Sequence, residues 1–250
     1  MVIKIGEDIM STYVICVGIL YSGNLGAIAR LCSNFGVEKL ILVKPECEID
    51  KEAYDRATHG KYYLDDCIIV DSLIEAKKYV DLLIALSARK GGKNSLARSS
   101  ISLEEYFEKN DFGGNVGFVL GRENWGLSNE ETDLCDLLVH IPIKGDNVVL
   151  NISHALSVVL WEQNKLNKEE IDSEKRLMTR EEKDAFMMML NDILSHVWIE
   201  EDKHYGMKRV FSMIIGRSMV TSREANTLIG TLRGIRRSLE GPHPPWDKHE

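Results

Sequence analysis

Short apolar runs of strand length alternate with segments of helical spacing along the first two thirds of the chain. The predicted strands lie at 13–20, 39–43, 67–70, 81–86 and 117–120, with a further run ending at 141–143. The predicted helices lie at 25–35, 51–58, 72–79 and 103–108. Strands that are apolar on both faces and alternate with helices indicate a mostly parallel sheet covered on both sides. The sequence therefore predicts an α/β fold.

The segment 152–166 is apolar nearly all round rather than along one stripe. A surface helix that covers a core on one side keeps polar residues on its outer face. We therefore expect this helix to be packed on two sides, one of them formed by a second subunit.

The composition changes after this helix. Residues 167–177 are rich in Lys, Glu, Asp and Ser, which is typical of a linker. Beyond it the pattern is purely helical, until a tail from Gly241 that has no helical pattern. The sequence predicts a domain at 1–166, a linker at 167–177 and a small helical extension at 178–250 with a loose tail.

Two helix starts stand out in that extension. Thr179 and Glu182 have the spacing of a capping box for a helix that runs to about residue 197, and Ser222 opens another helix. The apolar stripe of the second helix comprises Ala225, Leu228, Leu232, Ile235 and Leu239.

A polar turn follows the strand at 117–120. Gly121 and Gly126 bracket Glu123 and allow the backbone to turn tightly and to approach a ligand closely. Ser128 fits a helix N-cap, with Glu131 three residues on as its capping-box partner.

Further helix starts follow other strands. Asn24 ends the turn after the first strand and fits an N-cap, and Asn151 or Ser153 can cap the helix at 152–166. Loops and helix N-termini at neighbouring strand ends are where open α/β sheets bind ligands. We therefore expect a binding site at this edge of the sheet.

The net charge of −8 at pH 7 argues against a uniformly basic nucleic-acid binder. Residues 203–239 nevertheless carry eight Lys and Arg residues against one acid, Glu224. This basic segment suits a polyanionic partner.

The remaining composition predicts a cytoplasmic protein. The five cysteines are an odd number without a Cys-x-x-Cys pair, which indicates reduced thiols. The N-terminus lacks the pattern of a signal peptide, and the longest apolar runs, such as 14–21, are too short to span a bilayer. No membrane association is expected.

Three ordered motifs carry a family resemblance: 24–30 (NLGAIAR), 121–128 (GRENWGLS), and 141–143 (IPI) followed by 150–155 (LNISHA). They resemble the SpoU class of the SPOUT superfamily, whose members are S-adenosylmethionine-dependent RNA 2′-O-ribose methyltransferases. The match spans about 13–166. Within the class, the stretch 86–89 and the helical tail look like the TrmJ type, which methylates nucleotide 32 in the tRNA anticodon loop.

The resemblance implies features of the fold and of the cofactor site that the pattern of hydrophobic and polar residues does not predict. It implies a deep C-terminal trefoil knot, a feature otherwise nearly absent from proteins, and an obligate homodimer with the knot helices at its interface. It places S-adenosylmethionine in the knot, held by Leu86, Ser87, Ala88, Gly121, Ile141, Val148, Val149 and Leu150. Val149 departs from the many members that have Ser there, so one side-chain hydrogen bond would be missing while backbone contacts would survive.

The resemblance assigns catalytic positions to Arg30, Asn24, Glu123 and Asn151. The family's arginine is proposed to deprotonate the ribose 2′-hydroxyl with help from a phosphate. A neutral arginine base is costly because the guanidinium pKa is above ~12. We therefore favour an electrostatic role, in which Arg30 holds the neighbouring phosphate and stabilises the developing alkoxide. In-line attack on a sulfonium methyl group requires no metal.

The resemblance and the basic extension together imply tRNA as the partner. The expected RNA contacts are Arg209, Arg217, Arg223, Arg233 and Arg237. Two alternatives remain: a 2′-O-methyltransferase of another RNA site, such as rRNA or the tRNA D-loop, and a non-catalytic RNA-binding protein that keeps the knot. Val149 is the hint for the second, and the intact catalytic positions favour an enzyme.

Overall fold

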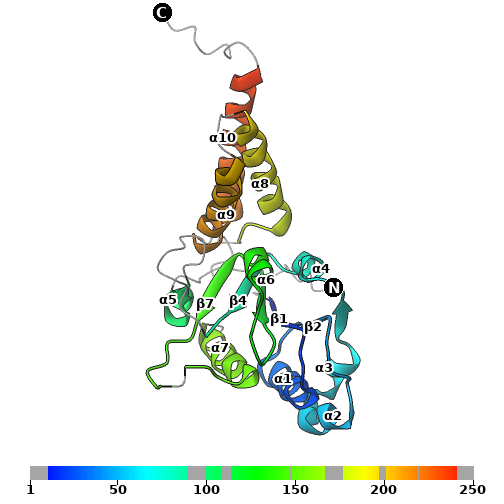
Figure 1. The fold of residues 1–250 in the computed structure, drawn as a ribbon. Helices are drawn as coiled ribbons and strands as arrows, with labels where there is room; N and C mark the ends of the chain where they lie inside the picture. Colours follow the sequence, from blue (N-terminus) through cyan, green and yellow to red (C-terminus); the bar gives the residue numbers. More distant parts are fainter. Residues whose placement is uncertain are drawn as a thin grey trace, which may run out of the picture.

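A parallel sheet forms the centre of the protein (Figure 1). The computed structural model describes residues 11–88, 100–108, 114–146, 148–166, 177–196, 201–218 and 220–240. Within these residues the strand order is β3-β2-β1-β6-β4-β7-β5, and every neighbouring pair is parallel. The strands are β1 (Ser11–Val17), β2 (Lys39–Val43), β3 (Ile68–Val70), β4 (Leu82–Leu86), β5 (Ile101–Ser102), β6 (Asn115–Leu120) and β7 (Leu137–His140). The predicted α/β fold with a parallel sheet is confirmed.

Helices connect the strands and then continue beyond the sheet. Those of the sheet-bearing part are α1 (Ser22–Phe35), α2 (Lys51–Ala57), α3 (Lys61–Asp65), α4 (Leu73–Ala76), α5 (Leu103–Glu108), α6 (Asn129–Leu134) and α7 (Ile152–Leu166). The later ones are α8 (Arg180–Ser195), α9 (Glu201–Arg217) and α10 (Ser222–Glu240). Among the described helices, none is both long and apolar enough to cross a membrane.

Alternating side chains of the strands enter two different cores. Val14 and Cys16 of β1 pack in one core with residues of α1, α2 and α7, whereas Ile15 and Val17 pack in the other with Leu73 of α4. A strand that is buried on both faces forms a continuous apolar run, which is why these strands were visible in the sequence.

Two glycines let α1 lie unusually close to its neighbours. A Cβ at Gly26 would strike the carbonyl group of Ala53 in α2, and a Cβ at Gly60 would strike the carbonyl group of Ala29 in α1. Because neither backbone contact leaves room for a side chain, glycine is required at both places. The close packing determines the position of α1, which carries Asn24 and Arg30.

Helix α7 has the bounds predicted from its apolar pattern, but only part of its surface is covered. Leu156, Val159 and Leu160 are buried against the sheet. Val158 and Trp161 are 37% and 55% exposed. The chain by itself therefore leaves an apolar face on α7.

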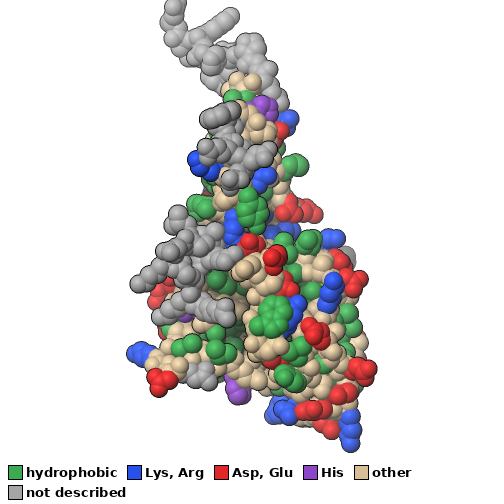
Figure 2. Space-filling view, in the orientation of Figure 1, with side chains coloured by type: hydrophobic (Ala, Val, Ile, Leu, Met, Phe, Trp, Pro, Cys, Tyr) green, Lys and Arg blue, Asp and Glu red, His purple; other side chains and the backbone are tan. Residues whose placement is uncertain are grey.

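Helices α8, α9 and α10 extend away from the sheet as a column, on which Lys and Arg side chains are visible (Figures 1 and 2). Their own core contains Phe186, Leu190, Ile215, Ala225 and Ile229. The capping box of Thr179 and Glu182 is present.

The apolar stripe predicted for α10 is only partly correct. Ala225 is buried, but Leu228, Ile235 and Leu239 are exposed, and the buried position after Ala225 is Ile229. The shift has a local cause, because the core that α10 shares with α8 and α9 extends along its first half only, as far as Leu232.

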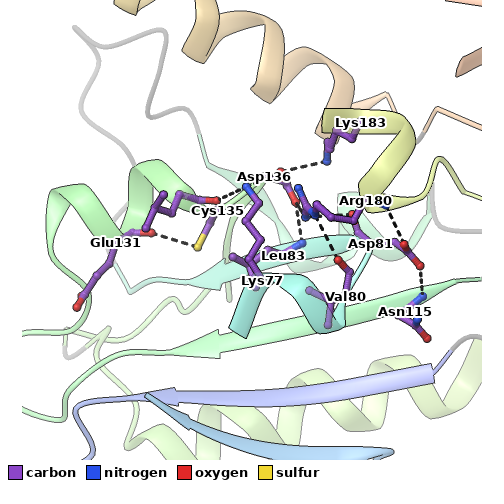
Figure 3. Close-up of polar contacts among 11 residues, drawn as sticks. Lys77, Val80, Asp81, Leu83, Asn115, Glu131, Cys135, Asp136, Arg180 and Lys183 are labelled. Atoms are coloured by element: carbon purple, nitrogen blue, oxygen red, sulfur yellow. Dashed lines mark hydrogen bonds and ion pairs between the residues drawn. The ribbon is translucent and has the colours of Figure 1, made fainter. Parts of the chain in front are cut away.

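A buried charge cluster joins the column to the sheet (Figure 3). Asp136, just before β7, accepts a hydrogen bond from Arg180 at 2.7 Å and lies 3.1 Å from Nζ of Lys183, both in α8. Lys77 lies 3.6 Å away on the other side, and the backbone N–H of Leu83 donates to the same carboxylate at 2.9 Å.

Burial and attraction act in opposite directions on this cluster. Burial raises the pKa of Asp136, but attraction to Lys183, Lys77 and Arg180 outweighs it and holds that pKa well below its usual range. Burial lowers the pKa of Lys183 to about 8, against the opposing attraction of Asp136. The first turn of α8 thus supplies the countercharge that Asp136 needs inside the protein.

Two further contacts support this junction. Asp81 accepts the backbone N–H of Arg180 at 3.0 Å and that of Asn115 at 3.0 Å, so it ties α8 to β6 (Figure 3). In α9, a Cβ at Gly216 would come within 2.6 Å of the carbonyl oxygen of Asp136. The backbone of α9 therefore packs directly against the backbone that precedes β7.

One strand end differs from the expectation. The apolar run was predicted to continue as strand through residues 141–143, but β7 ends at His140. Pro142 has no N–H to donate to a ladder. Ser87 N donates to Val139 O at 3.0 Å near the end of this edge, and the chain then leaves the sheet.

Candidate active site

The predicted site residues follow strands that are neighbours in the sheet. β1, β6, β4 and β7 lie side by side and parallel, so their carboxyl ends meet at one edge. Three polar side chains at this edge form a hydrogen-bonded relay that joins parts of the chain about a hundred residues apart.

Glu123 is the first member of the relay. Its carboxylate accepts the backbone N–H of Leu20 at 3.0 Å, that of Tyr21 at 3.3 Å, and the side-chain amide of Asn24 at 2.9 Å. Because an ionised carboxylate only accepts, three converging donors match its capacity. Glu123 therefore ties the turn after β6 to the start of α1.

Asn24 and Asn151 are the other two members. Nδ2 of Asn151 donates to Oδ1 of Asn24 at 3.0 Å, while Nδ2 of Asn24 donates to Glu123. Oδ1 of Asn151 accepts the backbone N–H and the hydroxyl of Ser153 at 2.9 and 2.8 Å. Asn151 thus caps α7, as predicted, and is also oriented by the relay.

The prediction of Asn24 as an N-cap is wrong. Helix α1 begins at Ser22, and Asn24 lies inside its first turn. A local sequence pattern cannot distinguish an N-cap from a side chain that forms a hydrogen bond to a residue distant in sequence. Here the side chain of Asn24 donates to Glu123 instead of capping α1.

The turn that carries Glu123 is closed tightly. The backbone groups of Arg122 and Gly126 exchange hydrogen bonds at 3.1 and 2.8 Å, and Gly126 has a φ of 80°. A Cβ at Gly121 would strike the backbone of Gly126. The capping box of Ser128 and Glu131 then starts α6, as predicted.

Arg122 supports this turn. Its guanidinium donates to both carboxylate oxygens of Glu131 at 3.0 and 3.1 Å and lies 3.6 Å from Glu46. The hydrogen bonds with Glu131 raise the pKa of Arg122 despite its burial, so it stays charged. The guanidinium fits against Gly18, where a Cβ would collide with it.

The residues predicted to hold the cofactor lie at the same edge. The stretch 86–88 begins at the last residue of β4, Gly121 follows β6, Ile141 follows β7, and the stretch 148–150 precedes α7. Leu86, Ile141 and Leu150 are half-buried, while Val148 and Val149 are exposed. Apolar side chains beside backbone groups fit an adenosine with a short chain of net positive charge, which a cluster of cations would repel.

Arg30 does not join the relay. It is exposed on α1, six residues after Asn24 and therefore about 9 Å further along the helix axis. Within the part of the chain that the structure describes, no carboxylate pairs with it. Its guanidinium is free to meet a phosphate.

The basic residues of the column fall into two groups. Arg223, Arg233 and Arg237 are exposed on α10. Arg217 is half-buried at the end of α9, and Arg209 is only 11% exposed and pairs with Asp133 at 2.6 Å. The Arg209 side chain is therefore engaged with α6, which its sequence neighbourhood did not reveal.

Sequence reasoning missed three features of the site. The backbone donors of Leu20 and Tyr21 could have been inferred only from their place directly after β1. Trp125 was part of a quoted motif, but nothing in the pattern showed that its ring would be exposed beside Arg122. The hydroxyl of Ser153 was considered only as a cap.

Comparisons with known proteins show which family the chain resembles. The model of the SpoU rRNA Methylase family matches residues 11–161. A tRNA (cytidine-2′-O-)-methyltransferase TrmJ of Methanocaldococcus jannaschii is 36% identical over 224 residues, which cover 88% of this chain and 97% of that protein.

Solved structures share the fold. The crystal structure of TrmJ from Z. mobilis ZM4 is similar with a TM-score of 0.68 at 23% identity, covering 90% of this chain and 99% of that one. The SpoU methyltransferase AviRb from Streptomyces viridochromogenes, in complex with the cofactor AdoMet, is similar over 66% of this chain and 63% of that one, with a TM-score of 0.51 at 23% identity.

Proposed function

Because the chain belongs to the SpoU rRNA Methylase family, we propose that it transfers the methyl group of S-adenosylmethionine to a ribose 2′-oxygen of tRNA. The observation that carries the proposal is the relay of Glu123, Asn24 and Asn151 beside the strand-end loops expected to hold the cofactor. The near full-length similarity to a tRNA (cytidine-2′-O-)-methyltransferase supports tRNA as substrate.

The residues divide the chemistry between them. S-adenosylmethionine would supply a methyl group on a sulfonium: the ribose 2′-oxygen attacks it in line, the sulfur leaves with the bonding pair as the neutral thioether S-adenosylhomocysteine, and the hydroxyl proton passes to the neighbouring phosphate or to water. The relay holds the amides of Asn24 and Asn151 in one orientation, so they can position the acceptor nucleotide without reorganising. The exposed Arg30 holds an adjacent phosphate and stabilises the charge that develops on the 2′-oxygen.

The finer parts of the proposal concern the fold around the cofactor. We place a trefoil knot at the C-terminal part of the sheet, in a domain at 1–166 that is followed by a linker at 167–177 and a helical RNA-binding extension at 178–250. In the sheet, β4 lies between β6 and β7, although both of these strands follow it in the chain. This order of the strands supports the knot. The protein is expected to act in the cytoplasm, where tRNA is found.

We assign the methylated position to nucleotide 32 of the anticodon loop. The experiment is to incubate an unmodified tRNA transcript and, in parallel, an rRNA transcript with the protein and S-adenosylmethionine. The 2′-O-methyl groups are then mapped through the resistance of the modified linkage to alkali. A methyl group at nucleotide 32 is expected. A methyl group in the D-loop, or on rRNA alone, would assign the enzyme to another site, and none on any RNA would favour the non-catalytic alternative suggested by Val149.

The protein is predicted to be a homodimer through α7. Val158 and Trp161 are exposed there, and burying apolar surface gains about 25 cal/mol per Å². Light scattering at micromolar concentration should give the dimer mass, and Trp161→Asp should shift it to the monomer. Met188→Asp, at an exposed apolar residue of α8, is the control that should remain dimeric. A monomeric wild type would refute the prediction.

The exposed arginines of α10 are predicted to bind tRNA. Deleting the column would leave Asp136 without Arg180 and Lys183, so substitution is the sharper test. Arg223, Arg233 and Arg237 changed together to Glu should weaken tRNA binding. Log affinity falls as log salt rises, and the magnitude of this negative slope should decrease by about 0.7–0.9 for each phosphate that the variant no longer neutralises.

The control for this prediction carries the same charge change elsewhere. Lys51, Lys61 and Lys78 are exposed on the sheet-bearing part, and their triple Glu variant should bind tRNA more tightly than the α10 variant. Cofactor affinity should be unchanged in both. Equal loss of tRNA binding in the two variants would show that net charge, not α10, is responsible.

A further inference from the structure

Two exposed aromatic side chains adjoin Glu123. Tyr21 is 61% exposed, and its backbone N–H donates to the Glu123 carboxylate at 3.3 Å. Trp125 is 52% exposed and lies two residues after Glu123 in the same closed turn. The relay assigns neither ring a role, and Tyr and Trp are enriched at the interfaces of proteins.

Trp125 is held from one side. The guanidinium carbon of Arg122 lies 4.2 Å from the centroid of the Trp125 ring, within the range of a cation–π contact. Arg122 is itself fixed by its two hydrogen bonds to Glu131. The indole ring is therefore held in place on one face and open on the other. Stacking a second flat group on the open face should cost little conformational entropy of the side chain.

Tyr21 stands at the wall of a cleft. The cleft has a volume of about 500 Å³ and is also lined by Asn24 of the relay, by Glu48 and Asp50, and by Arg56, whose charge is paired with Glu52 at 2.8 Å. Acidic side chains repel phosphate, so the cleft suits the neutral part of a nucleotide, its base or sugar, rather than its phosphate. Its volume is within the ~300–1,000 Å³ of ordinary small-molecule sites.

We propose that Trp125 and Tyr21 are stacking platforms for unpaired bases next to the acceptor ribose, so that the substrate is a nucleotide in a single-stranded loop. The proposal rests on the proposed function for its RNA. A base inside a helix already has both faces covered by its neighbours, whereas a base in a loop can place a face on an aromatic ring. The two aromatic rings can stack on any base, because every base has a π-face. They therefore favour unpaired nucleotides over paired ones and do not discriminate between sequences.

The test uses an unmodified tRNA transcript that carries 2-aminopurine at one anticodon-loop position at a time. Binding of the wild type should quench the fluorescence at one or two of these positions. Trp125→Ala should lose one quench and raise KM for tRNA about tenfold, while Trp125→Phe keeps most of both. Tyr21→Ala should act likewise at another position. At saturating tRNA, kcat should stay within about twofold, since stacking serves binding more than the chemical step.

A matched variant separates stacking from the loss of any exposed ring. Tyr79→Ala removes an exposed aromatic side chain that precedes β4, at the opposite end of that strand from the site, and should change neither quench nor KM. The same loop sequence annealed to a complementary strand should not be methylated by the wild type.

The outcomes distinguish this inference from the proposed function. If the wild type methylates tRNA while Trp125→Ala and Tyr21→Ala keep the quench and the KM, the platforms are refuted and the function stands. If the wild type quenches and the variants do not, but no methyl group is transferred, the stacking stands and the function fails. Loss of activity in Trp125→Ala together with dissociation to a monomer in light scattering would assign the ring to contact with a second copy and overturn the inference.

Discussion

Replacing Arg30 with alanine is expected to lower the turnover of tRNA methylation by ~10²-fold or more, on the scale of losing one donor to a developing oxyanion. The side chain is exposed on α1, so its loss should change the free energy of unfolding by no more than about 0.5 kcal/mol. Because the charge it stabilises appears only as the oxygen attacks, cofactor affinity should stay close to wild type.

Arg30→Lys separates the possible roles of this residue. Lysine keeps the positive charge but loses the planar fork that can hold two oxygens at once. Turnover in the lysine variant that lies between those of the wild type and the alanine variant would support electrostatic stabilisation. Lys61→Ala, which removes an exposed positive charge on the neighbouring α3, should retain wild-type turnover. If Arg30→Ala methylates tRNA at the wild-type rate with saturating cofactor, the catalytic assignment of Arg30 must be withdrawn.

Asp136→Asn is expected to cost about 3–5 kcal/mol in the free energy of unfolding, because removing one partner of a buried ion cluster leaves charge uncompensated. The carboxylate is fully buried and lies within 3.1 Å of both Arg180 and Lys183. Denaturant titration measures the loss. Glu52→Gln, which breaks an exposed ion pair with Arg56, should cost less than about 1 kcal/mol.

A second substitution tests the cause of that loss. Asp136→Asn with Lys183→Met removes one charge of each sign, so it should recover part of the stability lost in the single variant. If the double variant is as unstable as the sum of the two single ones, the electrostatic explanation of the junction is wrong.

The pH dependence of stability follows from the same carboxylate. The folded pKa of Asp136 is depressed, so its stabilising contribution is fully present above the unfolded value of about 3.9. That contribution is lost as pH falls below about 3.9 towards the folded pKa. Wild type should therefore lose more stability on acidification than Asp136→Asn does, and equal losses would contradict the assignment.

Features set by nearby residues could be predicted from the sequence. The capping boxes of Ser128 with Glu131 and of Thr179 with Glu182 involve residues three apart, and both are present. Helix α1 ends where the pattern predicted, at residue 35, and the next residue, Gly36, caps it with a φ of 65°. The strand pattern was recognisable because burial on both faces leaves apolar runs.

Features set by distant partners could not be predicted in the same way. The sequence around Asn24 fits a helix cap, and only the fold brings Glu123 and Asn151 to its amide. Asp136 looks like the last of several acids before an apolar strand, and nothing nearby marks it as buried, since Arg180 and Lys183 come more than forty residues later. Family resemblance supplied the site residues where local pattern had nothing to offer, and their catalytic and binding roles remain predictions.

We propose above all that the protein methylates a ribose oxygen of tRNA. The most direct measurement is to incubate unmodified tRNA with the protein and S-adenosylmethionine that carries a deuterated methyl group, digest the RNA to nucleosides and analyse them by mass spectrometry. We expect deuterated methyl on the sugar fragment of a nucleoside, formed at an initial rate lower by ~10²-fold or more when Arg30→Ala replaces the wild type. Label on the base fragment, or no label in any nucleoside, would contradict the proposal.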